Sequence, residues 1–285
     1  MLVYLNGKFV PKEKASVSVF DHGFLYGDGI YETLRAYHGK IFLLSKHLDR
    51  LKRSAAAISL KLPLPLDKIG EALHESLNVN KLTEAYVRIH LSRGPGEIGL
   101  DPALCHAPSM IIVTQPFKDY PVELYENGVA VAVVATRRNH PLAVSPVIKS
   151  TNFLNNILAK IESLKSGAYE GIMLNWEGHV AEGTISNIFI VKKGVLYTPD
   201  LETGILEGVT RDLVLHLARK NRVTARETRL KPKDLTEADE CFLTNTTVEV
   251  LPVTRVDGAA IGSGKPGPVT TALREAYQRE VARDV

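Results

Sequence analysis

The chain has 285 residues, of which 45% are hydrophobic and 24% are charged, so it is long enough for one large or two medium domains. The net charge of +3 is small, and no basic run predicts a nucleic-acid or membrane surface. No apolar stretch approaches the roughly 18 residues of a membrane span, and the N-terminus lacks the pattern of a signal peptide. Cys105 and Cys241 are typical of reduced thiols in a cytoplasmic protein, and no Cys/His spacing predicts a metal site.

The first part of the chain alternates strand patterns with tight turns. Two Gly-containing dipeptides, Asn6-Gly7 and His38-Gly39, separate short apolar runs and favour hairpin turns. Periodicity and breaker residues then predict helices and further strands. The expected elements are hairpins at 3–10 and 34–42, a helix capped by Ser45, a helix from Asp67 to about Leu77, and strands at 85–91 and 110–114.

A polar stretch with Pro121 separates this part from the rest and is typical of a connector. Beyond it the pattern predicts strands at 129–135, 172–174, 188–191, 195–197 and 240–243, and helices at 151–165, from Thr210 or Arg211 to about Lys220, and at 270–281. The helix at 151–165 carries Leu154, Ile157, Leu158 and Ile161 on one face. We therefore expect an α+β protein with a small domain over 1–118, a connector over 119–128 and a larger domain over 129–285.

Lys149 lies after Val147 and Ile148 and just before a predicted helix. Burial lowers the pKa of a lysine, and a neutral amine can attack a carbonyl to form a Schiff base. A lysine that only reaches for solvent at a helix start is the commoner case, so a catalytic role for Lys149 needs support from other residues.

Glu182 precedes Gly183 in a turn that leads into a predicted buried strand. It can be a solvated turn residue, or an anion held against a cation such as a protonated ring nitrogen. A pyridine cofactor that acts as an electron sink needs such a partner.

Three places can bind a phosphate group. Val209 and Thr210 begin a predicted helix and can offer backbone N–H groups, Thr246 lies in a turn after a strand, and Arg50 can offer a bidentate charge. The alternatives are a helix cap, a turn and a solvated arginine. Residues 94–99 match G-x-G-x-x-G, but Leu100-Asp101-Pro102 follows in place of a helix, so a connecting loop is favoured over a nucleotide site.

Taken together, five motifs resemble the class IV (fold type IV) pyridoxal-phosphate aminotransferases. They are residues 26–32, 47–51, 149–156, 182–189 and 206–211, in the order of that family and within a match from Tyr4 to about Gly267. The resemblance implies a two-domain fold type IV architecture and bound pyridoxal 5'-phosphate. It also implies that Lys149 binds the cofactor covalently and moves a proton, that Glu182 faces the ring nitrogen, and that Arg50, Val209, Thr210 and Thr246 hold the phosphate.

The substrate branch within this family rests on a second set of residues. Tyr86 and Arg88 resemble the Tyr-x-Arg of branched-chain aminotransferases, which implies exchange of the amino group between branched-chain L-amino acids and 2-oxoglutarate. There the tyrosine and the turn at Thr246 and Thr247 would bind the α-carboxylate, Arg88 a side-chain carboxylate, and Tyr31 would line an aliphatic pocket. The alternative for Tyr86 and Arg88 is structural pairing on one strand face.

Other activities of the same family stay open: transamination of D-amino acids or (R)-amines, and the aminodeoxychorismate lyase reaction. The D-amino-acid branch has an Arg-x-His trap where this chain has Ile98 and Leu100, which argues against it. Leu154 and Thr33 depart from the branched-chain pattern, where a tyrosine and a glycine are common. A scaffold without activity is a further alternative, disfavoured by the presence of Lys149, Glu182 and Arg50 together. The resemblance also implies at least a homodimer.

Overall fold

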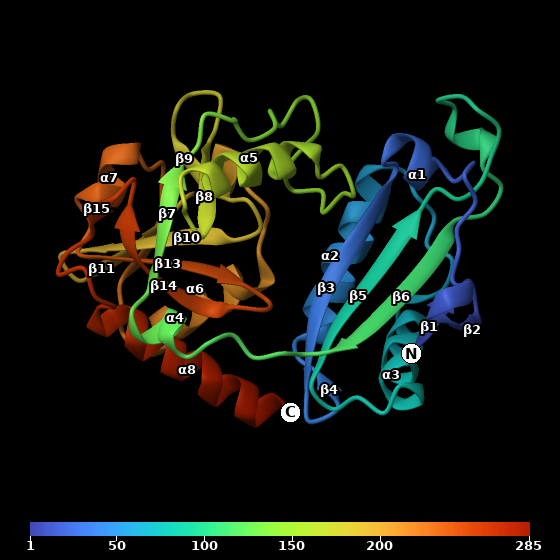
Figure 1. Ribbon diagram of the computed structural model, residues 1–285, viewed down its shortest axis with the longest axis horizontal. Coiled ribbons are helices and arrows are strands. Elements are labelled where there is room, and N and C mark those ends of the chain that lie inside the picture. The colour runs from blue at the N-terminus through green and yellow to red at the C-terminus, as the bar shows by residue number, and fades with distance from the viewer. The chain divides into compact units, whose positions relative to one another are not determined.

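The computed structural model describes all 285 residues, which form two compact units (Figure 1). The N-terminal unit comprises Met1–Lys118, Ile148–Asn152 and Asp284–Val285, and the C-terminal unit comprises Asp119–Val147 and Phe153–Arg283. Neither unit contains a helix with the length and apolar content needed to cross a membrane.

The N-terminal unit is a six-stranded antiparallel sheet with strand order β2-β1-β6-β5-β3-β4. Its elements are β1 (Leu2–Leu5), β2 (Lys8–Pro11), η1 (Lys12–Lys14), α1 (His22–Tyr26), β3 (Gly29–Tyr37), β4 (Lys40–Ile41), α2 (Leu44–Ala57), α3 (Leu66–Val79), β5 (Ala85–Ser92), η2 (Pro102–Leu104) and β6 (Ser109–Pro116). Both predicted hairpins are confirmed, and both residues of each turn have positive φ, as a type I′ turn requires.

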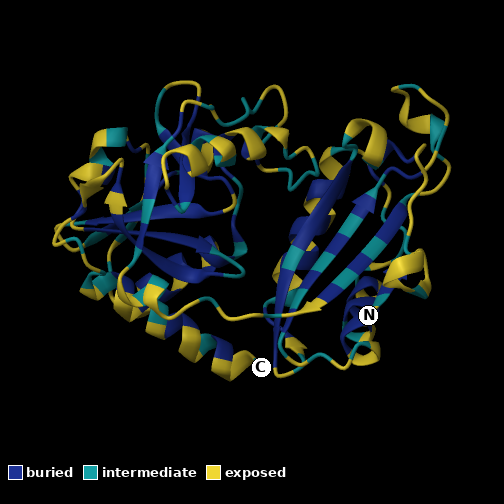
Figure 2. Cartoon of the chain, in the orientation of Figure 1, coloured by how far each residue is buried: buried dark blue, intermediate teal, exposed yellow.

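Helices α2 and α3 cover one face of this sheet and bury its apolar side chains (Figure 2). Because successive strand residues point to opposite faces, Val87 and Ile89 of β5 lie in the core while Tyr86 and Arg88 lie on the other face. The expected cap at Ser45 is wrong. Helix α2 already begins at Leu44, after Leu43 in the left-handed conformation, and has no side-chain cap.

The C-terminal unit is built on a nine-stranded mixed sheet, in which β15 pairs with β14 beside the order β12-β11-β10-β13-β14-β7-β8-β9. Its elements are α4 (Glu123–Glu126), β7 (Val129–Val133), α5 (Leu154–Lys165), β8 (Glu170–Leu174), β9 (Val180–Gly183), β10 (Asn187–Lys192), β11 (Val195–Thr198), η3 (Leu201–Thr203), α6 (Val209–Lys220), β12 (Ala225–Glu227), α7 (Pro232–Thr236), β13 (Glu240–Asn245), β14 (Glu249–Val256), β15 (Ala259–Ala260) and α8 (Pro268–Asp284). The expected α+β class is confirmed.

The segment around Lys149 differs from its expected place in the second domain. Tyr31 N donates to Lys149 O at 3.0 Å and Thr151 N donates to Gly29 O at 2.9 Å, so this segment extends along β3 of the N-terminal unit. These extended residues also explain why α5 begins at Leu154 and not at Thr151. The expected connector belongs to the C-terminal unit, where the Tyr125 hydroxyl of α4 donates to Val248 O at 3.4 Å.

Helix α5 buries the side opposite to the one its sequence suggests. Its buried residues are Asn156, Ala159 and Ser163. The apolar residues that share a helical face are exposed, Leu154 by 68% and Ile157 by 50%. We call this set the α5 apolar face; it consists of Leu154, Ile157, Leu158, Ile161 and Leu164.

Candidate functional site

The N-terminal unit brings Lys149, Tyr31 and Arg88 together. Lys149 Nζ lies 4.6 Å from the centroid of the Tyr31 ring, and the guanidinium carbon of Arg88 lies 4.0 Å from the same centroid. The backbone fixes this arrangement, because Lys149 O accepts from Tyr31 N and Lys149 N donates to Ser54 Oγ of α2 at 3.2 Å. Two cations on one aromatic ring make a face suited to a negatively charged ligand.

Arg88 is held in place by its two neighbours on the same face of β5. Its Nε donates to His90 Nε2 at 2.6 Å, and its Nη1 lies 3.4 Å from the Tyr86 hydroxyl. Burial lowers the pKa of His90 to about 4 and the charge of Arg88 acts in the same direction, so the imidazole is neutral and accepts. His90 was not among the residues singled out from the sequence, although its two-residue spacing from Arg88 was a usable signal.

Arg50 is a buried arginine, so the alternative of a solvated side chain is wrong. It donates from Nε to Glu32 Oε1 at 2.7 Å and from Nη2 to Glu32 Oε2 at 2.8 Å. His47, one turn earlier on α2, lies with Nδ1 2.8 Å from Glu32 Oε2. Burial acts to raise the pKa of Glu32, but Arg50 and His47 outweigh it and hold that pKa below its ordinary value. Glu32 therefore remains ionised and orients Arg50.

In the C-terminal unit, Glu182 lies buried at the end of β9, so it is not a solvated turn residue. Its carboxylate accepts from Arg138 Nε at 2.6 Å, from Leu206 N at 2.9 Å and from Asn187 Nδ2 at 3.2 Å. Such a set of donors holds the carboxylate in one orientation. Arg138 was not predicted as a site residue, because no local pattern links it to a carboxylate 44 residues away. Asn187 lies in the same motif as Glu182 but was not given a role of its own.

A second buried carboxylate, Glu170, holds the turn after Glu182. It accepts from Ile185 N at 2.8 Å and from Ser186 Oγ at 3.0 Å. A Cβ on Gly183 would lie 2.4 Å from Glu170 Oε1, so a larger residue there would force the Glu170 carboxylate to shift. Burial raises the pKa of Glu170, and the hydrogen bonds from Ile185 and Ser186 oppose that rise. Glu170 thus supports the loop that positions Glu182.

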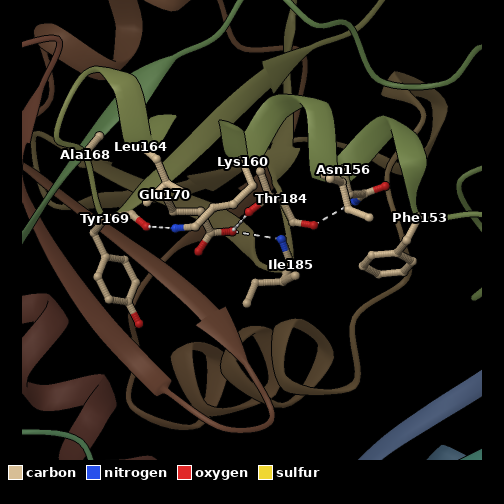
Figure 3. A pocket seen from close by; sticks show the side chains of 10 residues that line it. Phe153, Asn156, Lys160, Leu164, Ala168, Tyr169, Glu170, Thr184 and Ile185 are labelled. Carbon is tan, nitrogen blue, oxygen red and sulfur yellow. Dashed lines mark hydrogen bonds between the residues drawn. The ribbon is translucent and has the colours of Figure 1, made fainter. Parts of the chain in front are cut away.

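Glu170 also lines a cavity of about 500 Å³ beneath α5, which Figure 3 shows. Asn156 donates to Thr184 O at 2.7 Å across it, and Lys160 donates to Tyr169 O. None of the residues predicted as site residues lines this cavity, so it is distinct from the two groups described above.

Helix α6 begins at Val209 with Gly208 as its N-cap and no side-chain cap. The first backbone N–H groups of a helix have no acceptor within the helix, so those of Val209 and Thr210 can face a ligand. A Cβ on Gly208 would lie 1.9 Å from Asn187 Oδ1. The start of α6 therefore contacts the same asparagine that bonds Glu182.

The turn between β13 and β14 is closed by Asn245. Its Oδ1 accepts from Thr247 N at 2.8 Å, Thr247 Oγ1 at 2.9 Å and Val248 N at 2.9 Å. The amide of Thr247, expected to face a substrate carboxylate, is thus already used within the turn. Thr244 Oγ1, two residues before Thr246, is buried without a hydrogen-bond partner. A buried hydroxyl of this kind commonly marks a place that a ligand or water completes.

The two groups each offer part of the chemistry that pyridoxal phosphate requires. Arg50 and the amides at the start of α6 suit a phosphate, Glu182 suits a protonated ring nitrogen, and Lys149 supplies an amine. The residues of each unit therefore fit the part of this cofactor that they would hold.

A family model described as amino-transferase class IV matches residues 29–256. Among curated proteins, the chain is 43% identical over 278 residues to a putative branched-chain-amino-acid aminotransferase of Methanocaldococcus jannaschii, covering 98% of this chain and 96% of that protein. It is 36% identical to an aminodeoxychorismate lyase of Bacillus subtilis, covering 98% and 94% of the two chains. It is 34% identical to a D-alanine aminotransferase of Bacillus licheniformis, covering both chains fully at 100%.

Solved structures give the same result. The branched-chain amino acid aminotransferase of Escherichia coli superposes with a TM-score of 0.94 at 32% identity, covering 98% of this chain and 93% of that one. The branched-chain aminotransferase of Thermoproteus uzoniensis with norvaline gives 0.93 at 36% identity, covering 100% and 95% of the two chains. A further branched-chain amino acid aminotransferase, solved with pyridoxamine 5'-phosphate, gives 0.95 at 32% identity, also covering 100% and 95%. With the geometry above, these matches identify the chain as a member of the class IV aminotransferases, which are pyridoxal-phosphate-dependent transaminases.

Proposed function

We propose that this enzyme exchanges an amino group between branched-chain L-amino acids and 2-oxoglutarate. The observation that carries the proposal is the arrangement of Arg88, bonded to His90, lying near the Tyr86 hydroxyl and placed over the Tyr31 ring next to Lys149. One fixed guanidinium beside aromatic and aliphatic groups suits a site that takes both a dicarboxylate and an apolar side chain.

Each predicted residue has a defined task in this proposal. The cofactor, when bound, supplies the carbonyl that receives the amino group and a ring that delocalises negative charge. Arg50, Thr246 and the amides of Val209 and Thr210 would bind its phosphate, while Glu182 would hold the proton on the ring nitrogen. Lys149 would hold the cofactor through its Nζ, and the same amine, when free, would accept the proton from the substrate Cα and return it. Tyr86 and Thr246 would bind the α-carboxylate, while Thr247, whose amide is bonded to Asn245, would shape the turn. Tyr31 would line the side-chain pocket.

The D-amino-acid and lyase reactions are the alternatives, since relatives with those activities are 34% and 36% identical to the chain. Ile98 and Leu100 stand where the D-amino-acid branch has its carboxylate trap, and they are 74% and 85% exposed. Apolar side chains cannot bind a carboxylate, which favours the L-amino-acid reaction. The norvaline bound by the Thermoproteus uzoniensis enzyme also supports an aliphatic substrate.

The assembly we propose is a homodimer or a higher homo-oligomer. The α5 apolar face is the reason, because a contiguous exposed apolar face on a helix is typical of a surface that another chain covers. The expected cytoplasmic location fits the two cysteines, neither of which forms a disulfide. Light scattering of the purified protein and of Ile157→Asp tests the assembly: the variant should shift toward the monomer.

An absorbance titration tests the activity. The purified enzyme with pyridoxal phosphate should show a visible cofactor band that bleaches with L-leucine and with L-glutamate, added separately. Bleaching by D-alanine alone would move the assignment to the D-amino-acid reaction. A protein that never acquires the band would contradict the cofactor and leave a scaffold role.

A further inference from the structure

Beyond Tyr86 and Arg88, the open face of β5 carries one more polar side chain in contact with the proposed carboxylate-binding arginine. His90 follows Arg88 by two residues and stands opposite Tyr31 in the pairing of β3 with β5. Its ring is stacked on the Tyr31 ring with centroids 5.8 Å apart. The imidazole is thereby fixed on the same ring over which the guanidinium of Arg88 lies.

The hydrogen bond between them has a defined direction. Arg88 Nε always carries a proton, so His90 Nε2 is the acceptor and the ring proton resides on Nδ1. This bond occupies the Nε of the guanidinium, so its terminal nitrogens can bind a ligand. Nη1 also lies 3.4 Å from the Tyr86 hydroxyl. A guanidinium restrained at Nε loses less conformational entropy when it binds a carboxylate in a bidentate manner.

We infer that His90 is a positioning residue that sets the affinity for dicarboxylate substrates by holding Arg88 over the Tyr31 ring. The inference rests on the proposed function, since it assigns Arg88 to the side-chain carboxylate of glutamate and 2-oxoglutarate. Substrates with an aliphatic side chain do not use this charge, so the contribution of His90 is specific to one of the two half-reactions.

The test compares His90→Leu, His90→Gln and Arg88→Met by single-turnover bleaching of the cofactor band with L-glutamate and with L-leucine. His90→Leu lacks the acceptor and should weaken the apparent binding of L-glutamate about tenfold, because a hydrogen bond to a charged group is lost. The L-leucine reaction should change less than twofold. His90→Gln retains an acceptor and should restore most of the L-glutamate binding.

The outcomes separate the two claims. Equal losses with both substrates in His90→Leu would make His90 merely structural and overturn the inference. Unchanged L-glutamate binding in His90→Leu, together with a large loss in Arg88→Met, would overturn the role of His90 and leave the proposed function intact. Unchanged L-glutamate binding in Arg88→Met would contradict the proposed function itself. A visible band of ordinary intensity in each variant verifies that the fold and cofactor binding persist.

Discussion

The two units prepare their polar residues for a ligand in different ways. The N-terminal unit does so with side chains, as Glu32 orients Arg50 and His90 orients Arg88. The C-terminal unit also holds Glu182 with the side chains of Arg138 and Asn187, but it adds backbone donors at the start of α6 and in the turn supported by Glu170. Side-chain ion pairs are lost with a single substitution, whereas backbone donors are not. The N-terminal unit should therefore be the more sensitive to mutation and to acid.

Lys149→Ala is expected to have the largest effect and tests whether the N-terminal unit carries the chemistry. Removing the amine should lower the transamination rate by about 10³-fold or more, since general acid–base catalysis alone contributes roughly 10²–10⁴-fold. Steady-state kinetics with L-leucine and 2-oxoglutarate measures it. The exposed Lys165→Ala is the matched control and should keep the activity of the original enzyme. Equal activity in both variants would contradict the role of Lys149.

Glu32→Gln tests the buried ion pair of the same unit. Without the carboxylate charge, buried Arg50 is left uncompensated, and the free energy of unfolding should fall by about 3–5 kcal/mol. Chemical denaturation of the protein without cofactor measures the change, and exposed Glu75→Gln serves as the control. If the two variants unfold alike, the side-chain ion pair does not stabilise this unit.

Glu182→Gln tests the C-terminal unit with a smaller expected effect. The amide keeps the shape of the side chain but cannot hold a proton on a ring nitrogen by charge, so kcat should fall roughly 10²-fold, about 2.7 kcal/mol in the barrier. Denaturation should change less than in Glu32→Gln, because Arg138 is less buried than Arg50. A variant with unchanged kcat, measured beside exposed Glu126→Gln, would argue against the ring-nitrogen role.

Lowering the pH should destabilise the N-terminal unit more than the C-terminal unit, without any mutation. Burial lowers the pKa of His90 to about 4 and lowers that of His47 despite its bond to Glu32. The unfolded chain therefore binds more protons than the folded one between about pH 4 and 6.5. The contribution of the two histidines to the free energy of unfolding is complete above about pH 6.5 and is lost as the pH falls toward 4. The contribution of Glu170 to the free energy of unfolding has the opposite sign. Because its pKa is raised, that contribution is greater at low pH and declines as the pH rises above about 4.5.

Hydrogen exchange at pH 7 and pH 5, corrected for intrinsic rates, measures this difference. Protection should fall in α2 and β5 and hold in β8 to β10. A parallel loss in both units would show that their acid sensitivity does not follow these buried groups.

Local pattern was enough to predict much of the fold. Two Gly-containing turns located both hairpins, and the alternation over 85–91 placed Tyr86 and Arg88 on one strand face. The α5 apolar face was misread, because periodicity identifies an apolar face without saying whether the same chain covers it. Ser45 failed as a cap, since a left-handed Leu43 leads straight from β4 into α2.

The partners of the predicted site residues were harder to find. Lys149, Glu182 and Arg50 stood out by type and position, and the family matches agree with the motifs that contain them. Arg138 and Glu170 act through contacts that only folding creates, such as the bond between Arg138 and Glu182, so nothing in their local sequence marked them. Asn187 lies within the motif 182–189, but its bond to Glu182 is also visible only in the fold.

Asn187 fixes the spacing between Glu182 and the start of α6 in the C-terminal unit. One side chain bonds Glu182 Oε2 and Leu206 O, and it touches Gly208 at the start of α6. The separation between the carboxylate and the anion-binding amides is therefore set by covalent dimensions before any ligand arrives. A pyridine whose acidic group sits on a longer or shorter arm would reach only one of the two, so Asn187 would make this unit selective for the length of a ligand.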